Sequence, residues 1–361
     1  MLQTYLHIGS HKTGTKFFQH KYFPNINKHG FIYNPDDISQ LVLDLMKADN
    51  DDKSHVVTKI HDLLNAYELN GIKQLLISKE IMSGDLFSFY ENDYYTSSDG
   101  FKRLKEAFGN PKIIVSFRFQ TDWIISCYRE SLHEHHFQTF YDFAFQRSKE
   151  NAFVNPNYKN LDYKRILEEL FRLFSKDNVN ILFYENFKAD RSGEIKKIEQ
   201  ILSISDIKIT DQGDKIPNRG YSAFAVSLSL FRYRILRALF LDKLFIHRPI
   251  KFFGENSIPA GNERLSILSK QKYWGEYFLR DNEEVRSSNY PKALSFFEKL
   301  KLRLSWRYII KEFIDKIYYY DWDLASKQRS SLDEFFIKRN IELYESHKDK
   351  LKEIPTKYLD L

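Results

Sequence analysis

"HIGSHKTGTKFF", residues 7–18, joins the end of the alternating run "LQTYLHIG" to the start of the helix-like run "TKFFQHKYF". A turn between a strand and a helix points several backbone N–H groups outward, and the helix dipole adds positive potential there. Gly9 and Gly14 let the backbone approach an anion closely, and the hydroxyls of Thr13 and Thr15 are further donors. The stretch therefore predicts a strand–loop–helix unit that holds a phosphate-like anion.

The first half of the chain continues the same alternation. Apolar runs of buried-strand type recur after helical stretches, at residues 73–78, 112–118 and 179–185. Strands that alternate with helices predict a parallel sheet covered on both faces, so the expected fold class is α/β, with a P-loop-like sheet flanked by helices. Beyond about residue 205 the pattern becomes mostly helical. We expect a main domain over 1–290 and a helical C-terminal extension over 291–361.

Composition limits the classes of function. The 361 residues carry 55 basic and 49 acidic side chains, for a net charge of +6, which favours a small anion, a polysaccharide or a membrane face over nucleic acid. The single cysteine, Cys127, excludes an internal disulfide and a multi-cysteine metal site, and it indicates a reducing compartment. No signal-peptide pattern and no uninterrupted run of some 18 apolar residues is present. We expect a cytoplasmic protein, and the alternative is a cytoplasmic protein in peripheral contact with a membrane.

The glycine loop differs from the loop of ATP-binding proteins. In the usual P-loop, a lysine and then a serine or threonine directly follow the second glycine. Here Thr15 and Lys16 follow Gly14 in the reverse order, and the other lysine, Lys12, precedes the glycine. This order weakens the interpretation as a P-loop kinase, which stays as an alternative beside an ordinary turn with solvated lysines.

A second motif stands at the strand expected over 112–118, which is the third along the chain. In "SFRFQTDWIISCYRE", residues 116–130, a strand ends at Arg118 and a helix is expected to start near Thr121 or Asp122. Ser126 then lies about one turn inside that helix, eight residues after the arginine. That spacing allows both side chains to reach one phosphate, although the serine hydroxyl also has the simpler option of bonding to local backbone.

Together "KTGTK", residues 12–16, and "RFQTDWIIS", residues 118–126, resemble the motifs of sulfotransferases that use 3′-phosphoadenosine 5′-phosphosulfate (PAPS), and of the bacterial carbohydrate type in particular. The resemblance covers roughly 1–290 and includes "LDYKRILEEL", "NILFYENF" and "YFLRDNEEVRSSNY". Two departures are Lys16, where a hydroxyl residue is usual, and Phe119-Gln120 in place of Asn-Pro. Neither removes a donor to phosphate.

The resemblance implies a transfer of the sulfuryl group from PAPS to a carbohydrate hydroxyl by in-line displacement, with PAP as product and without a metal. Lys12 would act on the bridging and leaving oxygens, and the amides from Thr13 through Gly14 and Thr15 to Lys16 would hold the 5′-phosphate. Arg118 and Ser126 would bind the 3′-phosphate. In the loop "KIPNRGYS", residues 215–222, Arg219 is a further candidate and Lys215 a weaker one. A non-catalytic relative that binds PAP or polysaccharide is the alternative from another class.

The general base is placed at Glu80 in "LLISKEIMSG". The carboxyl ends of parallel strands line the ligand crevice, so a glutamate directly after the strand at 73–78 should face the nucleotide loop. Several carbohydrate sulfotransferases have a glutamate after the second strand, and this resemblance supports the assignment. The rival bases are His133, His135 and His136, and a helix-capping or surface-paired glutamate is the structural alternative.

The histidines, the aromatic residues and one basic segment bear on metal binding and on the acceptor. The histidines of "SLHEHHF" lack the spacing of a zinc peptidase, so a solvated face is favoured over a metal site. Aromatic residues make up 16% of the chain, which suits sugar faces as well as a core. The basic and apolar segment 230–253 fits a buried helix pair better than a membrane surface with glycolipid acceptors. The acceptor is expected to be a surface polysaccharide or glycolipid, and the oligomeric state is left open.

Overall fold

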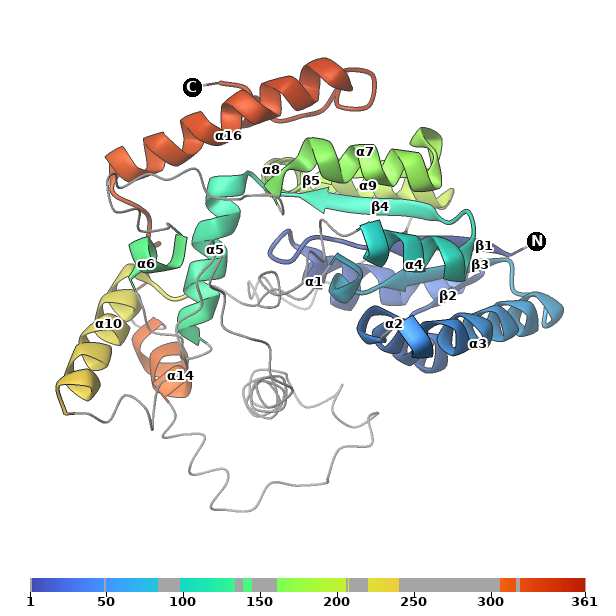
Figure 1. The fold of residues 1–361 in the computed structure, drawn as a ribbon, viewed down its shortest axis with the longest axis horizontal. Coiled ribbons are helices and arrows are strands. Elements are labelled where there is room, and N and C mark those ends of the chain that lie inside the picture. The colour runs from blue at the N-terminus through green and yellow to red at the C-terminus, as the bar shows by residue number, and fades with distance from the viewer. Residues whose placement is uncertain are drawn as a thin grey trace. The chain divides into compact units, whose positions relative to one another are not determined.

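The structure of the chain is a computed structural model (Figure 1). It describes residues 2–48, 50–83, 98–133, 139–144, 161–205, 207, 220–239, 306–315 and 319–360. The chain divides into two compact units. The first unit comprises Met1–Trp123, Tyr158–Lys215 and Ser326–Leu361, and the second comprises Ile124–Asn157 and Ile216–Ala325.

The first unit is built on a five-stranded sheet in which every pair of neighbouring strands is parallel. The strand order is β2-β3-β1-β4-β5. The bounds are β1 Gln3–His7, β2 Phe31–Tyr33, β3 Gln74–Ser78, β4 Lys112–Phe117 and β5 Val179–Phe183. The expected α/β class with a parallel sheet is thus confirmed. The short β2 was not predicted, because three residues are too few to show an alternating pattern.

The strand order brings three strand ends together. β1 lies between β3 and β4, and His7 is in register with Ser78 on one side and with Ile114 on the other. The chain leaves β1 toward β3 and β2 on one side, and it later continues to β4 and β5 on the other side. Crevices that bind ligands form outside the carboxyl ends of the strands at such a reversal. The segments that follow β1, β3 and β4 therefore meet at one edge of the sheet.

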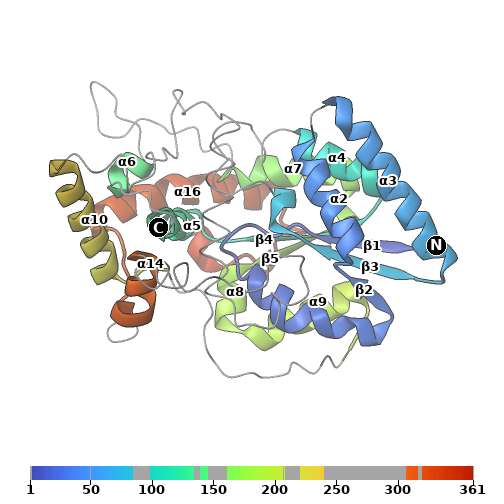
Figure 2. The ribbon, with the colours of Figure 1, turned by 90° about the horizontal axis from the view of Figure 1, so that it is seen from below.

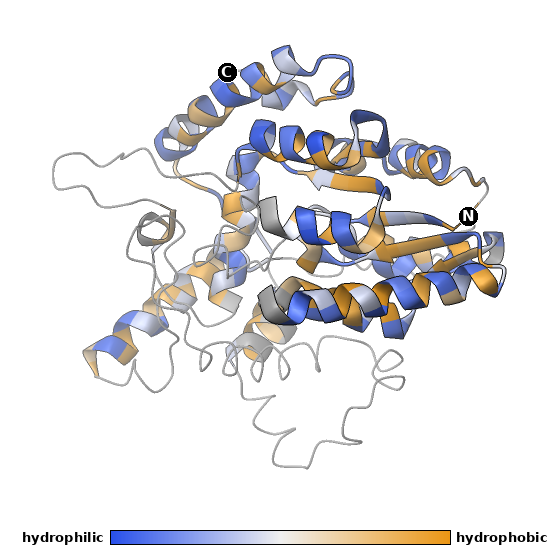
Figure 3. Ribbon diagram, turned by 45° about the vertical axis from the view of Figure 1, so that its right-hand side comes forward, coloured by the Kyte–Doolittle hydropathy of each residue, from blue (hydrophilic) through white to orange (hydrophobic). Residues whose placement is uncertain are grey.

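Helices cover both faces of this sheet (Figure 2). One face carries α2 Asp36–Lys47, α3 Asn50–Leu69, α4 Ser98–Phe108 and α7 Tyr163–Phe174. The other carries α1 Thr15–Phe17, η1 Phe18–Tyr22, η2 Phe23–His29, α8 Tyr184–Ala189 and α9 Arg191–Leu202. Figure 3 shows that the strands are mostly apolar, whereas the helices carry a mixture of apolar and polar residues, as expected for helices between a sheet and solvent. The core of the second face includes Tyr5, Leu76, Ile114 and Leu182 from the strands, packed against Phe18, Tyr22, Phe23, Ile198 and Leu202.

The end of the chain belongs to the sheet-bearing unit. Helix α16 Ser326–Ser346 packs against α7, and the buried side chains of Gln120 and Asn340 exchange two hydrogen bonds of 2.7 and 3.0 Å. The short η8, Thr356–Tyr358, places Tyr358 in the core. The boundary expected between residues 290 and 291 lies outside the described residues, so that division of the chain stays a prediction.

The described part of the second unit is mostly helical, as expected for the chain beyond residue 205. It contains α6 Phe140–Ala144, α10 Ala223–Ala238, α14 Trp306–Ile309, η7 Ile310–Ile314 and the part of α5 Gln120–His133 that follows Trp123. Aromatic rings of Tyr128, Phe140 and Trp322 pack together in it. Among the helices that the structure describes, none combines the length and the apolar content that a membrane span requires.

Candidate functional site

The loop between β1 and α1 has the backbone of an anion-binding turn. Gly9, Lys12 and Gly14 have left-handed conformations, with φ values of 51°, 66° and 84°. A Cβ at Gly9 would lie 2.5 Å from Cγ2 of Thr15, so only glycine fits there. Lys12 is not a glycine and holds this conformation at a cost on the order of 1–2 kcal/mol. Strain of this kind is concentrated at functional sites, and it falls here on the lysine that the sequence singled out.

The two threonine hydroxyls of the loop are used inside the protein. Thr13 is buried, and its hydroxyl donates to the Ser10 carbonyl at 2.6 Å, which closes the turn. The Thr15 hydroxyl donates to a carboxylate oxygen of Glu80. Each hydroxyl thus has an acceptor within the fold, and the expectation that the hydroxyls serve as additional anion donors stays a prediction. The other candidate anion donors of the loop are its backbone amides and the side chains of Lys12 and Lys16.

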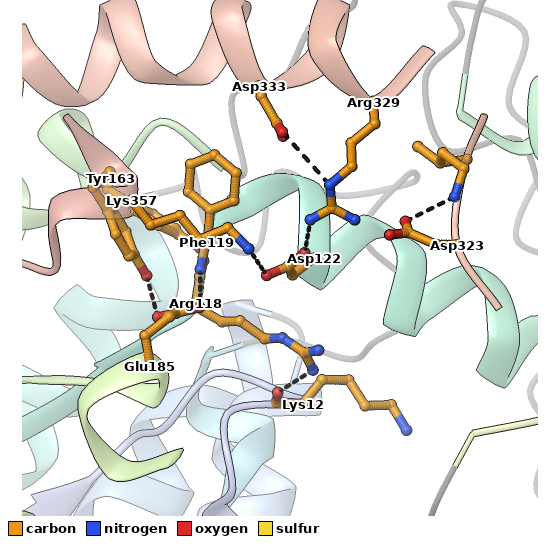
Figure 4. A network of polar contacts seen from close by, with 12 residues as sticks. Lys12, Arg118, Phe119, Asp122, Tyr163, Glu185, Asp323, Arg329, Asp333 and Lys357 are labelled. Carbon is orange, nitrogen blue, oxygen red and sulfur yellow. Dashed lines mark hydrogen bonds and ion pairs between the residues drawn. The ribbon is translucent and has the colours of Figure 1, made fainter. Parts of the chain in front are cut away.

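Arg118 directly follows β4 and lies against the same loop. Its Nη1 donates to the Lys12 carbonyl at 3.0 Å, and its guanidinium lies 4.6 Å from the centre of the Tyr184 ring. Figure 4 shows the guanidinium beside the carbonyl of Lys12. The Nε atom of Arg118 is buried and has no hydrogen-bond partner in the described part of the chain. A cation held in this way, with a donor still unsatisfied, is suited to an anionic ligand.

A second layer fixes the backbone around Arg118. The Tyr163 hydroxyl donates to the Arg118 carbonyl, and the next amide, that of Phe119, donates to Glu185 Oε1 at 2.9 Å. The Tyr358 hydroxyl donates to the other oxygen of Glu185, also at 2.9 Å. Burial raises the pKa of Glu185, and these hydrogen bonds only partly offset that effect. The Glu185 carboxylate thus ties the start of α5 to the end of β5.

Glu80 lies where the sequence placed it, at the start of η3 Glu80–Ser83 and directly beyond β3. One of its oxygens accepts from Thr15, and the other lies 3.0 Å from Nδ1 of His11. Burial alone would raise the pKa of Glu80, but the His11 imidazole, the Thr15 hydroxyl and the Lys16 ammonium hold it well below its usual range. The carboxylate is therefore ionised and linked to two residues of the glycine loop.

The start of α5 is anchored by ion pairs within the first unit. The Asp122 carboxylate pairs with Arg329 and with Lys357, the latter at 2.5 Å, as Figure 4 shows. Trp123 is buried, and its Nε1 donates to the His11 carbonyl at 2.6 Å. Ser126 lies in α5 and is partly exposed, but it belongs to the part of that helix grouped with the second unit. Its joint action with Arg118 stays a prediction.

The structure thus gathers Lys12, Thr15, Lys16, Glu80 and Arg118 around one loop. Arg219 and Lys215 lie outside the described residues, as do His135 and His136. His133 is the last residue of α5, and its side chain is not among those described.

Sequence reasoning missed three residues of the site: His11, Tyr184 and Glu185. A signal for the last two was present, because "YE" directly follows the strand-like "VNILF" and so falls at the same carboxyl edge of the sheet. His11 adjoins Lys12, but nothing in the sequence indicates its contact with Glu80.

Among the described residues, no group of three or more His, Cys, Asp or Glu side chains is arranged to hold a metal ion.

Comparison with known proteins found similarity only to solved structures. No family model and no curated protein matches the chain. A sulfotransferase from Alicyclobacillus acidocaldarius is 13% identical, with 69% of this chain and 97% of that chain covered, at a TM-score of 0.36. The mouse sulfotransferase SULT7A1 complexed with PAP is 12% identical, with 79% and 87% covered, at a TM-score of 0.26. Both TM-scores lie below 0.5, so the likeness establishes neither the family nor the function.

Proposed function

We propose that the protein is a PAPS-dependent sulfotransferase that transfers a sulfuryl group to a carbohydrate hydroxyl. The observation that carries the proposal is the convergence of the Lys12 loop and Arg118 at the carboxyl edge of the parallel sheet, where Nη1 of Arg118 donates to the Lys12 carbonyl. Two cationic side chains from separate strand ends suit a ligand with two separate anionic groups. PAPS is such a ligand, with a 5′-phosphosulfate and a 3′-phosphate.

The residues present fit this ligand in several respects. The left-handed residues of the loop leave room for the backbone to approach a 5′-phosphate, and Gly9 sits where a Cβ could not. The unpartnered Nε of Arg118 is a donor for the 3′-phosphate, for which Ser126 and Arg219 are the other candidates. When bound, PAPS supplies an activated sulfuryl group. Lys12 would stabilise negative charge on the leaving oxygen, and no metal is required in this scheme.

The proposal also includes the acceptor, the partners and the cellular location of the protein. We expect a hydroxyl of a surface polysaccharide or glycolipid, no nucleic-acid partner, and a cytoplasmic protein that can touch a membrane surface. The large apolar side chains of Phe224, Phe231 and Ile235 on α10, and of Leu239 directly after it, are exposed, which is consistent with such contact.

One observation favours a second candidate, a P-loop kinase. The Thr15 hydroxyl and the Glu80 carboxylate are hydrogen-bonded beside the glycine loop, and a hydroxyl next to a carboxylate is a common environment for Mg²⁺ at a nucleotide phosphate. The order of Lys12, Gly14 and Lys16 argues against it, because no lysine directly follows the second glycine.

Two measurements test the proposal. Calorimetry with PAP and ADP should show tighter binding of PAP, because ADP lacks the 3′-phosphate; equal affinities would contradict the assignment. Incubation with ³⁵S-labelled PAPS and a glycan extract of the source organism should then give labelled polysaccharide or glycolipid. Tight PAP binding without any labelled product would instead indicate the non-catalytic binding protein.

A further inference from the structure

If the protein transfers a sulfuryl group as proposed, a residue near Lys12 must take the proton from the acceptor hydroxyl. His11 and Glu80 come from different strand ends, and His11 Nδ1 lies 3.0 Å from Glu80 Oε2. Their side chains are 14% and 21% exposed, so the pair is sheltered but reachable by a ligand. His11 directly precedes Lys12, the residue proposed to act on the leaving oxygen.

The main chain and the side chain of His11 are both held by contacts within the fold. Its carbonyl accepts a hydrogen bond of 2.6 Å from Nε1 of the buried Trp123, and its ring is held by Glu80. The Thr15 hydroxyl occupies the other oxygen of Glu80, which leaves that carboxylate oriented toward the histidine. An imidazole with Nδ1–H donated to a carboxylate is in the tautomer that carries its lone pair on Nε2. The carboxylate also stabilises the imidazolium that forms when Nε2 accepts a proton.

Glu80 itself is less suited to direct proton transfer. Each of its oxygens already accepts a hydrogen bond or an ion pair within the fold. Burial would raise the pKa of Glu80, but His11, Thr15 and Lys16 together hold it well below its usual range. A carboxylate stabilised in this way is a weak proton acceptor. Catalytic bases work best when they titrate close to the operating pH, as imidazoles do.

We infer that His11 is the general base of the transfer and that Glu80 is the residue that positions it. The acceptor hydroxyl gives its proton to Nε2 of His11 as its oxygen forms the new bond to sulfur. The bond between that sulfur and the 5′-phosphate oxygen breaks, and its electron pair leaves with PAP. The histidine then releases the proton to solvent, so no oxidant, reductant or other reactant is needed.

The test uses the full chain and PAPS, with release of PAP measured in single turnovers from pH 5 to pH 9 and with water as the acceptor. Variants are His11→Gln and Glu80→Gln, with His29→Gln as a matched control, because His29 is exposed and lies at the end of η2. The other titratable groups that interact with Glu80 are Lys16 and the buried His7, and Lys12 is the neighbour of His11 in the chain. Binding of PAP is measured for each variant by calorimetry.

We expect wild type and His29→Gln to lose rate toward acid pH as the proposed base becomes protonated. Glu80→Gln should show this loss only at a lower pH, because its side chain no longer stabilises the imidazolium. His11→Gln should lose this acid limb together with about 10²- to 10⁴-fold in rate, while its PAP affinity stays within a few-fold. A His11→Gln variant that keeps a near-normal rate, while Glu80→Gln does not, would overturn the inference in favour of Glu80 as the base.

A second measurement does not depend on turnover. ¹⁵N NMR of labelled histidine should show His11 protonated on Nδ1 and not on Nε2 at pH 8, and this preference should be lost in Glu80→Gln. Protonation of His11 on Nε2 in the wild type would refute the inference whatever the rates. Failure of the proposed function has a different signature, namely no PAP binding by the wild type with the His11 tautomer unchanged.

Discussion

Replacement of Arg118 by alanine tests the nucleotide site most directly. Within the described part of the chain the guanidinium donates to the Lys12 carbonyl at 3.0 Å and lies 4.6 Å from the centre of the Tyr184 ring. Its Nε is buried without a partner in the described part of the chain. Alanine would remove the proposed donor to the 3′-phosphate and also the support that the guanidinium gives to the glycine loop.

The two losses affect the binding of PAP and the binding of ADP to different extents. A hydrogen bond to a charged group contributes about 1.5 to 3 kcal/mol, which corresponds to about 10- to 150-fold in the dissociation constant. The loss at the 3′-phosphate affects PAP alone, because ADP has no such group. The loss of loop support affects both nucleotides, so the ratio of their affinities isolates the direct contact.

Calorimetry on three variants measures that ratio. Arg118→Ala should remove most of the preference for PAP over ADP, and Arg118→Lys should keep a part of it, because lysine retains the charge without the fork of donors. Arg172→Ala is the control, since Arg172 is on the exposed side of α7 and pairs with Glu169. An unchanged preference in Arg118→Ala would refute the assignment of the 3′-phosphate to Arg118.

Three further predictions concern the loop, the metal and acid stability. Lys12→Ala should lower kcat much more than it weakens PAP binding, because its proposed partner gains charge mainly in the transition state; equal losses in both would mean that Lys12 only anchors the ground state. Turnover should be insensitive to EDTA, and activity that EDTA abolishes and Mg²⁺ restores would favour the kinase. Burial lowers the pKa of His7 from 6.5 to about 4, so below pH 6.5 the unfolded chain binds a proton that the folded chain resists. The free energy of unfolding should fall by about 3 kcal/mol from pH 6.5 to pH 4, at about 1.4 kcal/mol per pH unit. Urea unfolding of wild type and His7→Asn checks this, and an equal pH dependence in both would contradict it.

Local pattern was enough for most of the secondary structure. The four longer strands were predicted within one or two residues, because β1 is an alternating run before the glycine loop and the other three are short apolar runs that follow helical stretches. Helix α7 begins at Tyr163 because Asp162 caps it, with its side chain accepting from the Arg165 amide at 3.2 Å. The segment after Gly14 was expected to be an ordinary helix, and it forms only three α-helical residues before a π-helical turn. Packing of Phe18, Tyr22 and Phe23 against the sheet accompanies that change of helix type.

Local sequence was enough to predict the alternation of strands and helices, the glycine loop with Lys12, and the place of Arg118 at the end of a strand. Each of these depends on residues within a few positions of one another, where periodicity and turn chemistry act. Which strand ends meet depends on contacts between distant parts of the chain. Thr15 and Glu80 are 65 residues apart, and Gln120 and Asn340 are 220 apart. The strand order β2-β3-β1-β4-β5 sets Glu80 and Arg118 on opposite sides of the β1 loop, and it thereby makes the pairing of His11 with Glu80 possible. Contacts of that separation are fixed by the packing of buried faces, which leaves no periodic trace along the chain.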